Sequence, residues 1–205
     1  MTYRPSWNEY FLLQAKLAAV RSTCNSRPQG AVLVRDRRIV ATGYNGALPG
    51  QEHCSDQINL LCPKCMGGCL HKRNITPLNC SYCENSGFVP YCRRRATQTP
   101  DAQKDRACAS AHAEANAVAQ AARMGIAVDG STLYCTTRPC APCAKLLAQS
   151  GVIKVFYELD YDDPDDGWLL DILPMERLEV SPEALEAAMA VLQPGTSRRR
   201  LGRTG

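Results

Sequence analysis

Two short stretches of the sequence combine residues that can hold a metal ion with a residue that can move a proton. His112 and Glu114 are separated by one residue, and Cys140 and Cys143 follow Pro139 downstream. At the start of a helix, residues three apart project from the same side, so the two cysteine sulfurs can reach one ion. Imidazole nitrogen and cysteine sulfur are common zinc ligands. The spacing therefore predicts a zinc site held by His112, Cys140 and Cys143.

Three protein ligands leave one position of a tetrahedral zinc ion open for a water molecule, whose pKa the metal lowers from about 15.7 to about 7. Glu114 stands about 200° around a helix from His112, so both can face one pocket only at an open first turn. There we expect Glu114 to carry the water proton as a general base and then an acid. The alternative is a structural zinc site that one more cysteine closes, with Cys135 as the candidate, but it leaves Glu114 beside the metal without a role.

The elements around these stretches should alternate between strands and helices. Apolar periodicity, with glycine after each helix, predicts helices over 111–124 and 140–149 and strands over 132–135 and 153–157. This order implies parallel neighbouring strands in one sheet, with helices on its faces. The remaining C-terminal elements are predicted as a short helix over 167–173, an edge strand over 177–180 and a last helix over 182–192.

The N-terminal part predicts one helix, one hairpin and one loop. Ser6 and Glu9 have the spacing of a capping box before apolar residues at helical spacing, so we expect a helix over 7–22. The hairpin is expected to pair strands over 31–34 and 39–42 across a polar turn. The stretch 43–50 holds too many turn formers to be regular, and we expect it to be a binding loop.

A cysteine-rich stretch interrupts the chain from residue 55 to residue 105. Two Cys-x-x-Cys pairs match a zinc ribbon, in which four thiolates bind one structural ion: Cys62, Cys65, Cys80 and Cys83. The basic run 93–95 leaves open a contact with nucleic acid or a partner. We favour a metal staple for a segment too poor in apolar residues to fold alone. Cys69, His71 and Cys92 have no assigned role.

Composition bounds the class of protein. A chain of 205 residues, 45% hydrophobic and 21% charged, suits one principal globular domain, so we expect a main domain over 1–193 that contains the insertion 55–105. No apolar run approaches the about 18 residues of a membrane span, and we find no signal-peptide core, which predicts a cytoplasmic protein. The 12 cysteines then favour reduced, zinc-bound thiolates over disulfides.

The net charge of +4 is concentrated at the end of the sequence. The stretch 194–205 holds four arginines and no acidic residue, so the rest of the chain is neutral, and we expect this stretch to be a disordered basic tail. A neutral body makes nucleic acid an unlikely partner, because a nucleic-acid surface needs basic residues along its length. A small-molecule substrate fits better.

With these motifs in place, the sequence resembles the deoxycytidylate (dCMP) deaminases of the cytidine deaminase-like superfamily. The resemblance covers about 7–178 outside the insertion. Its landmarks are the stretches 6–10, 21–24, 30–32, 43–46, 112–117, 139–143 and 149–151. It implies an α/β fold, a three-layer α/β/α sandwich on a five-stranded mixed sheet, and a homohexamer.

The resemblance also implies a reaction, the zinc-dependent hydrolysis of dCMP to dUMP and ammonia. Zinc held by the three predicted ligands would activate a water for attack on C4 of cytosine, and Glu114 would carry its proton to N3 and then to ammonia. Asn45 would hold the sugar or the base edge, with a turn residue before Gly46 as its alternative role. Ser26, Arg27 and Tyr161 would meet the 5′-phosphate.

Regulation and a further metal are implied in the same way. The family loop that here contains Gly46 and Gly50 is associated with activation by dCTP and inhibition by dTTP. Arg123, near the substrate end of its helix, would contribute to that switch, with a favourable cation near a helix C-terminus as its alternative role. A second, structural zinc would be held by Cys24, Cys54 and Cys108, with His53 or His71 as the alternative third ligand. Buried free cysteines are the alternative.

Two other functions stay open from the sequence. The first is a zinc deaminase of another base or nucleoside, such as guanine, a pterin or deoxycytidine. The second is a zinc-ribbon nucleic-acid-binding protein, for example a DNA-uptake accessory, with a vestigial deaminase site. The intact zinc motif and the neutral body argue against the second.

Overall fold

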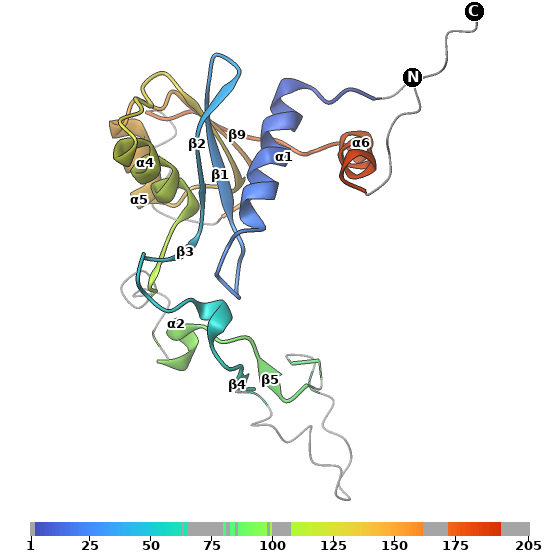
Figure 1. The fold of residues 1–205 in the computed structure, drawn as a ribbon, viewed down its shortest axis with the longest axis vertical. Coiled ribbons are helices and arrows are strands. Elements are labelled where there is room, and N and C mark those ends of the chain that lie inside the picture. The colour runs from blue at the N-terminus through green and yellow to red at the C-terminus, as the bar shows by residue number, and fades with distance from the viewer. Residues whose placement is uncertain are drawn as a thin grey trace, which may run out of the picture.

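A computed structural model of the protein describes residues 3–62, 64, 80, 83–84, 86–97, 99, 108–161 and 172–193. Its centre is a five-stranded sheet in the order β2-β1-β7-β8-β9 (Figure 1). The strands are β1 (Gly30–Arg35), β2 (Arg38–Tyr44), β7 (Thr132–Thr137), β8 (Lys154–Leu159) and β9 (Met175–Arg177). β1 runs antiparallel to both of its neighbours, whereas β7, β8 and β9 are parallel to one another. The sheet is therefore mixed, as predicted.

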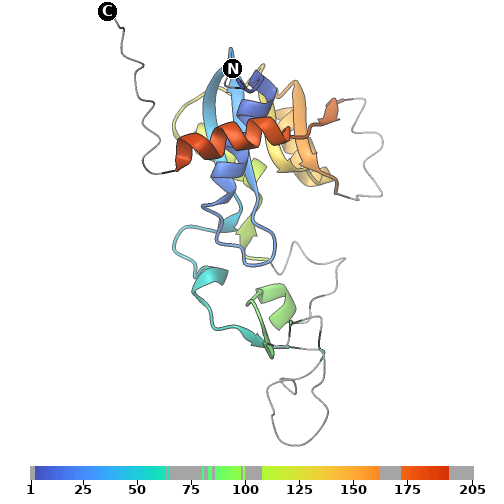
Figure 2. The same ribbon diagram turned by 90° about the vertical axis from the view of Figure 1, so that its right-hand side faces the viewer.

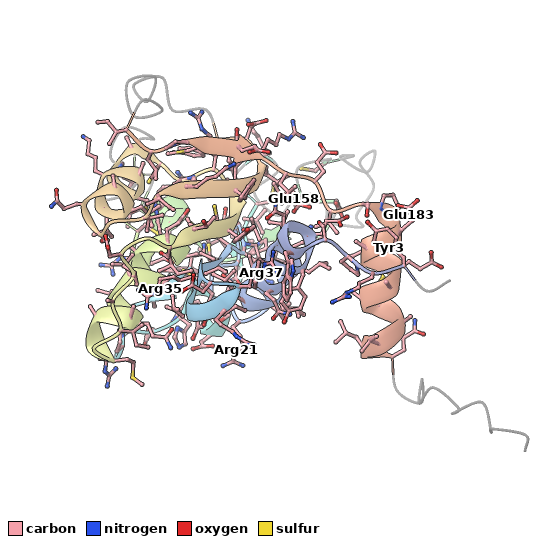
Figure 3. All side chains as sticks on the ribbon, turned by 90° about the horizontal axis from the view of Figure 1, so that it is seen from above. Tyr3, Arg21, Arg35, Arg37, Glu158 and Glu183 are labelled. Carbon is pink, nitrogen blue, oxygen red and sulfur yellow. The ribbon has the colours of Figure 1, made fainter. Side chains whose placement is uncertain are left out.

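Helices cover both faces of this sheet. They are α1 (Trp7–Ala19), α4 (Ala113–Arg123), α5 (Ala141–Gln149) and α6 (Pro182–Leu192). Figures 1 and 3 show α4 and α5 on one face and α1 on the other, with α6 outside α1. This arrangement confirms the predicted three-layer α/β/α sandwich.

The period of two in the strands sends alternate side chains to two separate cores. Leu33, Leu133 and Val155 belong to the core between the sheet and the helices α4 and α5. The next residues along two of these strands, Tyr134 and Phe156, pack in the second core, beside α1. Burial on both faces explains the apolar runs within β1, β7 and β8.

Two glycines allow the helices to approach the sheet closely. A Cβ atom on Gly43 would lie 2.1 Å from the carbonyl oxygen of Ala113 in α4, and one on Gly30 would lie 2.0 Å from that of Ala15 in α1. No side chain fits at these distances. The glycines therefore set the depth at which the two helix layers rest on the sheet.

The predicted capping box is confirmed and extends further than expected. The Ser6 hydroxyl accepts a hydrogen bond from the Glu9 backbone, and the Glu9 carboxylate accepts one from the Ser6 backbone. The same carboxylate accepts hydrogen bonds from Ser181, the N-cap of α6, and from the Tyr3 hydroxyl, which lies next to α6 in Figure 3. Glu9 thus joins the start of α1 to the start of α6.

The described part of the cysteine-rich stretch projects from one end of the sandwich (Figures 1 and 2). Its regular elements are short: η1 (Cys54–Asp56), β4 (Leu60–Leu61), β5 (Phe88–Val89) and α2 (Arg93–Ala96). β4 pairs with β5, and at the root of the stretch β3 (Gly46–Ala47) pairs with β6 (Ser110–Ala111). The boundaries 55 and 105 and the tail 194–205 stay predictions.

Some element boundaries differ from those predicted. The first helix ends at Ala19 rather than residue 22, and the edge strand lies at Met175–Arg177 rather than 177–180. The stretch 43–50 is only partly irregular, because pairing with neighbouring strands extends β2 to Tyr44 and creates β3. The predicted helix 167–173 falls mainly outside the described residues, and its last two residues are not helical. None of the described helices has the length and apolar composition needed to span a membrane.

Candidate metal centre and active site

The structure brings the side chains of His112, Cys140 and Cys143 together. The Nδ1 atom of His112 lies 3.4 Å from each of the two sulfurs, and all three candidate ligand atoms lie within 4.8 Å of one another. A tetrahedral zinc ion with bonds of about 2.1 Å to nitrogen and about 2.3 Å to sulfur separates such ligands by about 3.5 Å. The spacing of the donor atoms therefore fits a zinc ion.

Two helix starts hold these ligands in place. His112 is the N-cap residue of α4 and Cys140 that of α5, and neither side chain makes a capping hydrogen bond. Both side chains are therefore turned to the cluster rather than to their own helices. Each sulfur also lies near the positive end of the α5 dipole, which favours thiolate.

The protonation of the two cysteines suits a site for a cation. A hydrogen bond from Cys143 lowers the pKa of the Cys140 thiol to about 5, and the same pairing raises the pKa of Cys143. The first proton thus leaves readily, whereas the second leaves when a cation compensates two adjacent negative sulfurs. The donor set and its charge both fit zinc.

Glu114 lies in the first turn of α4, two positions after the zinc-ligand candidate His112, and its side chain is buried. Burial raises the pKa of its carboxyl group above the ordinary value. Its charge acts on Cys143, one of the two sulfurs, so the carboxylate borders the cluster. A carboxyl group with a raised pKa, beside a metal site, can accept a proton and release it again.

The predicted substrate residues gather at the same end of the sheet. β1 is antiparallel to β2 and β7, so the start of β1 meets the ends of the other two strands. The loop with Ser26 and Arg27 precedes β1, Asn45 follows β2, and Tyr161 follows β8, which is parallel to β7. The Asn116 side chain donates a 2.7 Å hydrogen bond to the Tyr44 carbonyl, which places the start of α4 at this end.

Asn45 is buried and most of its amide group is already engaged. Its Nδ2 donates to the Arg27 carbonyl at 2.8 Å, and its Oδ1 accepts from the Ser22 hydroxyl at 2.6 Å and the Gln29 amide at 2.8 Å. These bonds hold the loop 22–29 against the end of β2. An amide has two donor hydrogens, so one N–H of Asn45 is left for a substrate.

The predicted effector residues do not lie together. Gly46 is buried beside the loop 22–29, where a Cβ would lie 2.7 Å from the Thr23 hydroxyl oxygen, and Gly50 is exposed with a φ of +81°. Arg123 is the last residue of α4, about 15 Å along the helix from the ligands, and it is exposed. The expectation that Arg123 lies near the substrate end of its helix was wrong, because the site occupies the start of α4.

The cysteines predicted for a second zinc are neighbours without forming a tight cluster. Burial raises the pKa of the Cys54 and Cys108 thiols, and the sulfurs of Cys24 and Cys92 raise both further. Two groups of described residues have all their ligand atoms within 4.8 Å of one another, and these cysteines belong to neither group. The buried Nδ1 of His53, next to Cys54, has no hydrogen-bond partner among the residues that the structure describes. Cys92 had no assigned role in the sequence, because no motif or spacing related it to Cys24, Cys54 and Cys108.

Three of the four predicted ribbon cysteines form a compact cluster. Cys62, Cys80 and Cys83 have their sulfurs within 4.8 Å of one another, and the sulfurs of Cys62 and Cys80 are 3.7 Å apart. Two sulfurs bound to one tetrahedral zinc lie about 3.8 Å apart. Cys65, Cys69 and His71 fall outside the described residues. The cluster is consistent with a zinc site within the insertion.

Sequence reasoning missed two residues that shape the site from the substrate loop. The Ser22 hydroxyl bonds Asn45, and the Gln29 side chain accepts from the Thr136 hydroxyl of β7. Ser22 was marked only as part of the stretch 21–24 and Gln29 by no local pattern, since their partners lie far along the chain.

Comparisons with known proteins agree with this geometry. Residues 5–159 match the family model described as the cytidine and deoxycytidylate deaminase zinc-binding region. The deoxycytidylate deaminase of Mycobacterium phage D29 is 39% identical over 154 residues, covering 75% of this chain and 95% of that protein. ComE operon protein 2 of Bacillus subtilis is 34% identical over 158 residues, 77% of this chain, which spans only 62% of that relative.

A solved structure supports the same assignment. The dCMP deaminase from the cyanophage S-TIM5, in complex with dCMP and dUMP, superposes with a TM-score of 0.55 at 25% identity, covering 86% of this chain and 99% of that one. The matching family model, the phage relative and the ligand cluster lead to one conclusion. The chain belongs to the cytidine and deoxycytidylate deaminase family, whose members carry a zinc-binding region.

Proposed function

We propose that the protein hydrolyses dCMP to dUMP and ammonia. The observation that carries the proposal is the convergence of His112, Cys140 and Cys143 on one point, bordered by the buried carboxyl of Glu114. Three donors leave a fourth tetrahedral position for water, which a structural site would close with a fourth ligand. An open metal position beside a proton carrier is what hydrolytic deamination requires.

The residues of the site divide the work. Zinc, when bound by His112, Cys140 and Cys143, supplies a water of lowered pKa. Glu114 would take one proton from this water and pass it to N3 of the ring. It would then take the second proton from the oxygen that has added to C4 and pass it to the departing amino group. Its burial suits this role, because burial raises the pKa of the carboxyl group and so makes its carboxylate a stronger proton acceptor.

The loop 22–29 and Asn45 support a nucleotide substrate. Asn45 has one N–H left for the sugar or base edge, and Ser26 and Arg27 belong to the loop that it holds. The half-buried Tyr161 lies at the same end of the sheet. We propose Ser26, Arg27 and Tyr161 as contacts to the 5′-phosphate. The relatives named deoxycytidylate deaminase favour dCMP, whereas the name ComE operon protein 2 does not specify a substrate.

Further features of the family extend the proposal. We propose that dCTP and dTTP act as effectors through the loop with Gly46 and Gly50, that the enzyme is a cytoplasmic homohexamer, and that Arg123 contributes from the far end of α4. The insertion holds one structural zinc through Cys62, Cys80, Cys83 and Cys65. We propose that Cys24, Cys54 and Cys108 bind a further zinc ion, and that binding moves their three sulfurs closer together.

A side-by-side assay tests the substrate. Ammonia release is measured from dCMP, deoxycytidine, CMP and guanine, with and without dCTP. We expect selective turnover of dCMP. Turnover of deoxycytidine or guanine instead would keep the zinc chemistry and reject the 5′-phosphate contacts, and no turnover on any of the four would reject the enzymatic proposal.

A further inference from the structure

Thr137, the last residue of β7, carries a buried hydroxyl oxygen for which the described residues offer no hydrogen-bond partner. Burial of an unpaired hydroxyl costs stability, so such groups are rare in folded proteins. The neighbouring hydroxyl of Thr136, by contrast, is fully engaged with Gly30 and Gln29 at the start of β1. The Thr136 hydroxyl therefore stabilises the fold, whereas the Thr137 hydroxyl makes no such contact with the described residues.

Strand alternation directs the Thr137 side chain toward the metal centre. Leu133 and Cys135 lie in the core beneath α4 and α5, and Thr137 continues the same face. Cys135 is close to Glu114, since burial and then the Glu114 charge raise the pKa of its thiol. Thr137 lies one step further toward the site, and Cys140 follows only three positions later, within about 10 Å along the chain.

We propose, on the basis of the proposed function, that the Thr137 hydroxyl forms a hydrogen bond with the polar edge of the substrate pyrimidine. A hydroxyl donates one hydrogen bond and accepts two, so it can pair with the 4-amino group, N3 or the ring carbonyl. The pyrimidine must bring C4 to the ligand cluster, and its polar edge then passes the end of β7. Thr137 is thereby a residue that determines specificity, and the substrate completes its hydrogen bonding.

The test compares Thr137→Val, which removes the hydroxyl at nearly constant volume, with Thr137→Ser, which keeps it. Ser131→Ala is the matched control, because Ser131 is fully buried directly before the start of β7 and its hydroxyl also lacks a partner among the described residues. Zinc content, melting temperature, kcat and KM for dCMP, and calorimetric binding of dUMP are measured for each zinc-loaded protein.

We expect Thr137→Val to lower kcat/KM about tenfold and to weaken dUMP binding about as much, with zinc content and melting temperature maintained. Thr137→Ser should stay within about threefold of the parent, and Ser131→Ala should be indistinguishable from it in kinetics. If Thr137→Val does not fold, Thr137→Ala replaces it in the same comparison.

A Thr137→Val enzyme with kcat/KM and dUMP affinity within twofold of the parent overturns the inference, as does an equal loss in Ser131→Ala. These outcomes presuppose an active parent and leave the proposed function intact. A parent that turns over no pyrimidine contradicts the proposed function instead, and dUMP binding then still decides the Thr137 contact. A zinc-loaded parent that does not bind dUMP overturns both.

Discussion

Two residues at the metal centre occupy helix N-cap positions without capping their helices. Ser6 and Ser181 cap α1 and α6 through their hydroxyls, whereas His112 and Cys140 occupy the same position of α4 and α5 without capping them. A missing cap costs a helix about 1 kcal/mol. The two helices at the site lack this stabilisation because the imidazole and the thiol at their N-caps point to the ligand cluster instead. The absence of a normal cap is thus itself a functional signal.

Replacing Glu114 by Gln should separate metal binding from proton transfer. We expect Glu114→Gln to retain zinc and to lose activity about 10³-fold or more, because the amide keeps the shape of the side chain but cannot accept a proton. The measurement is ammonia release from dCMP, with metal analysis of the same sample. Glu183→Gln, at an exposed position of α6, is the control. A Glu114→Gln enzyme with more than a tenth of parental activity would remove Glu114 from the mechanism.

Not every polar residue in the site was assigned its main role from the sequence. Asn45 was expected to bind the substrate, with a turn position as the alternative. The structure gives it a third task, since three of its hydrogen bonds hold the loop 22–29. A sequence identifies an amide at a loop position, but only the fold reveals how many of its donors and acceptors are already used.

Secondary-structure elements are joined at the N-terminal side by one carboxylate. Glu9 is only 8% exposed and accepts hydrogen bonds from Ser181, Ser6 and Tyr3. These bonds, that of the Ser181 hydroxyl first, lower the pKa of Glu9 to about 2 from an ordinary value of 4.5. The charged form therefore stabilises the fold at neutral pH.

The sign of this shift sets a pH dependence. Because the folded pKa lies below the unfolded one, the contribution of Glu9 is complete above about pH 4.5 and is lost as the pH falls toward about 2. We expect Glu9→Gln to lower the free energy of unfolding by about 2 kcal/mol at pH 7. Denaturant titrations of the parent and the variant between pH 7 and pH 3 should show that the difference in their free energies of unfolding decreases below pH 4.5. A constant difference between pH 7 and pH 3 would exclude the linkage.

The Asn25 side chain connects the loop 22–29 to the insertion. The Asn25 amide donates to the carbonyls of Cys54 at 2.7 Å and Tyr91 at 3.3 Å, both in or beside the insertion. Its neighbour Ser26 is a proposed phosphate contact. The insertion therefore supports the loop from outside, as Asn45 does from inside.

Breaking this connection should affect binding rather than chemistry. We expect Asn25→Ala to raise KM for dCMP about fivefold with kcat nearly unchanged, since the loop loses its outer support while Glu114 and the ligands stay in place. Gln57→Ala removes an exposed hydrogen bond to Glu52, just before the start of the insertion, and serves as the control. An unchanged KM in Asn25→Ala would show that the loop holds its position without the insertion.

The whole molecule combines a sandwich with two apolar cores and an insertion whose described part has only a very small one. The described core of the insertion is Cys62, Cys83 and Val89, with Leu60 and Cys80 packed against it. So few apolar residues cannot offset the entropy of ordering such a segment, whereas a structural zinc can. The cysteine cluster thus takes the place of a hydrophobic core.

Removing one cysteine of this cluster should release one metal and spare the other. We expect Cys80→Ser to contain one zinc fewer than the parent by native mass spectrometry, with more rapid proteolysis of the insertion and catalytic zinc retained. Cys140→Ser is the counterpart, since it should lose the other zinc together with activity. Equal zinc in Cys80→Ser and the parent would contradict a metal site in the insertion.

The sequence by itself determined the elements and the chemistry. Helices and strands followed from apolar periodicity, and the start of α1 and the bounds of α6 from capping residues and proline, all of which act within a few residues. The ligand set followed from residue type and spacing, because His112 and the two cysteines sit at helix starts that the local sequence defines.

Only the tertiary structure decided which distant residues meet. Strand pairing set the ends of β2 and β3, the antiparallel position of β1 set the end of the sheet where the site lies, and the direction of α4 separated Arg123 from it. The engaged amide of Asn45, the neighbours of Cys92 and the unpaired hydroxyl of Thr137 depend on contacts between segments far apart in the chain. Local patterns carry no information on such contacts, because packing and backbone pairing across the sheet create them.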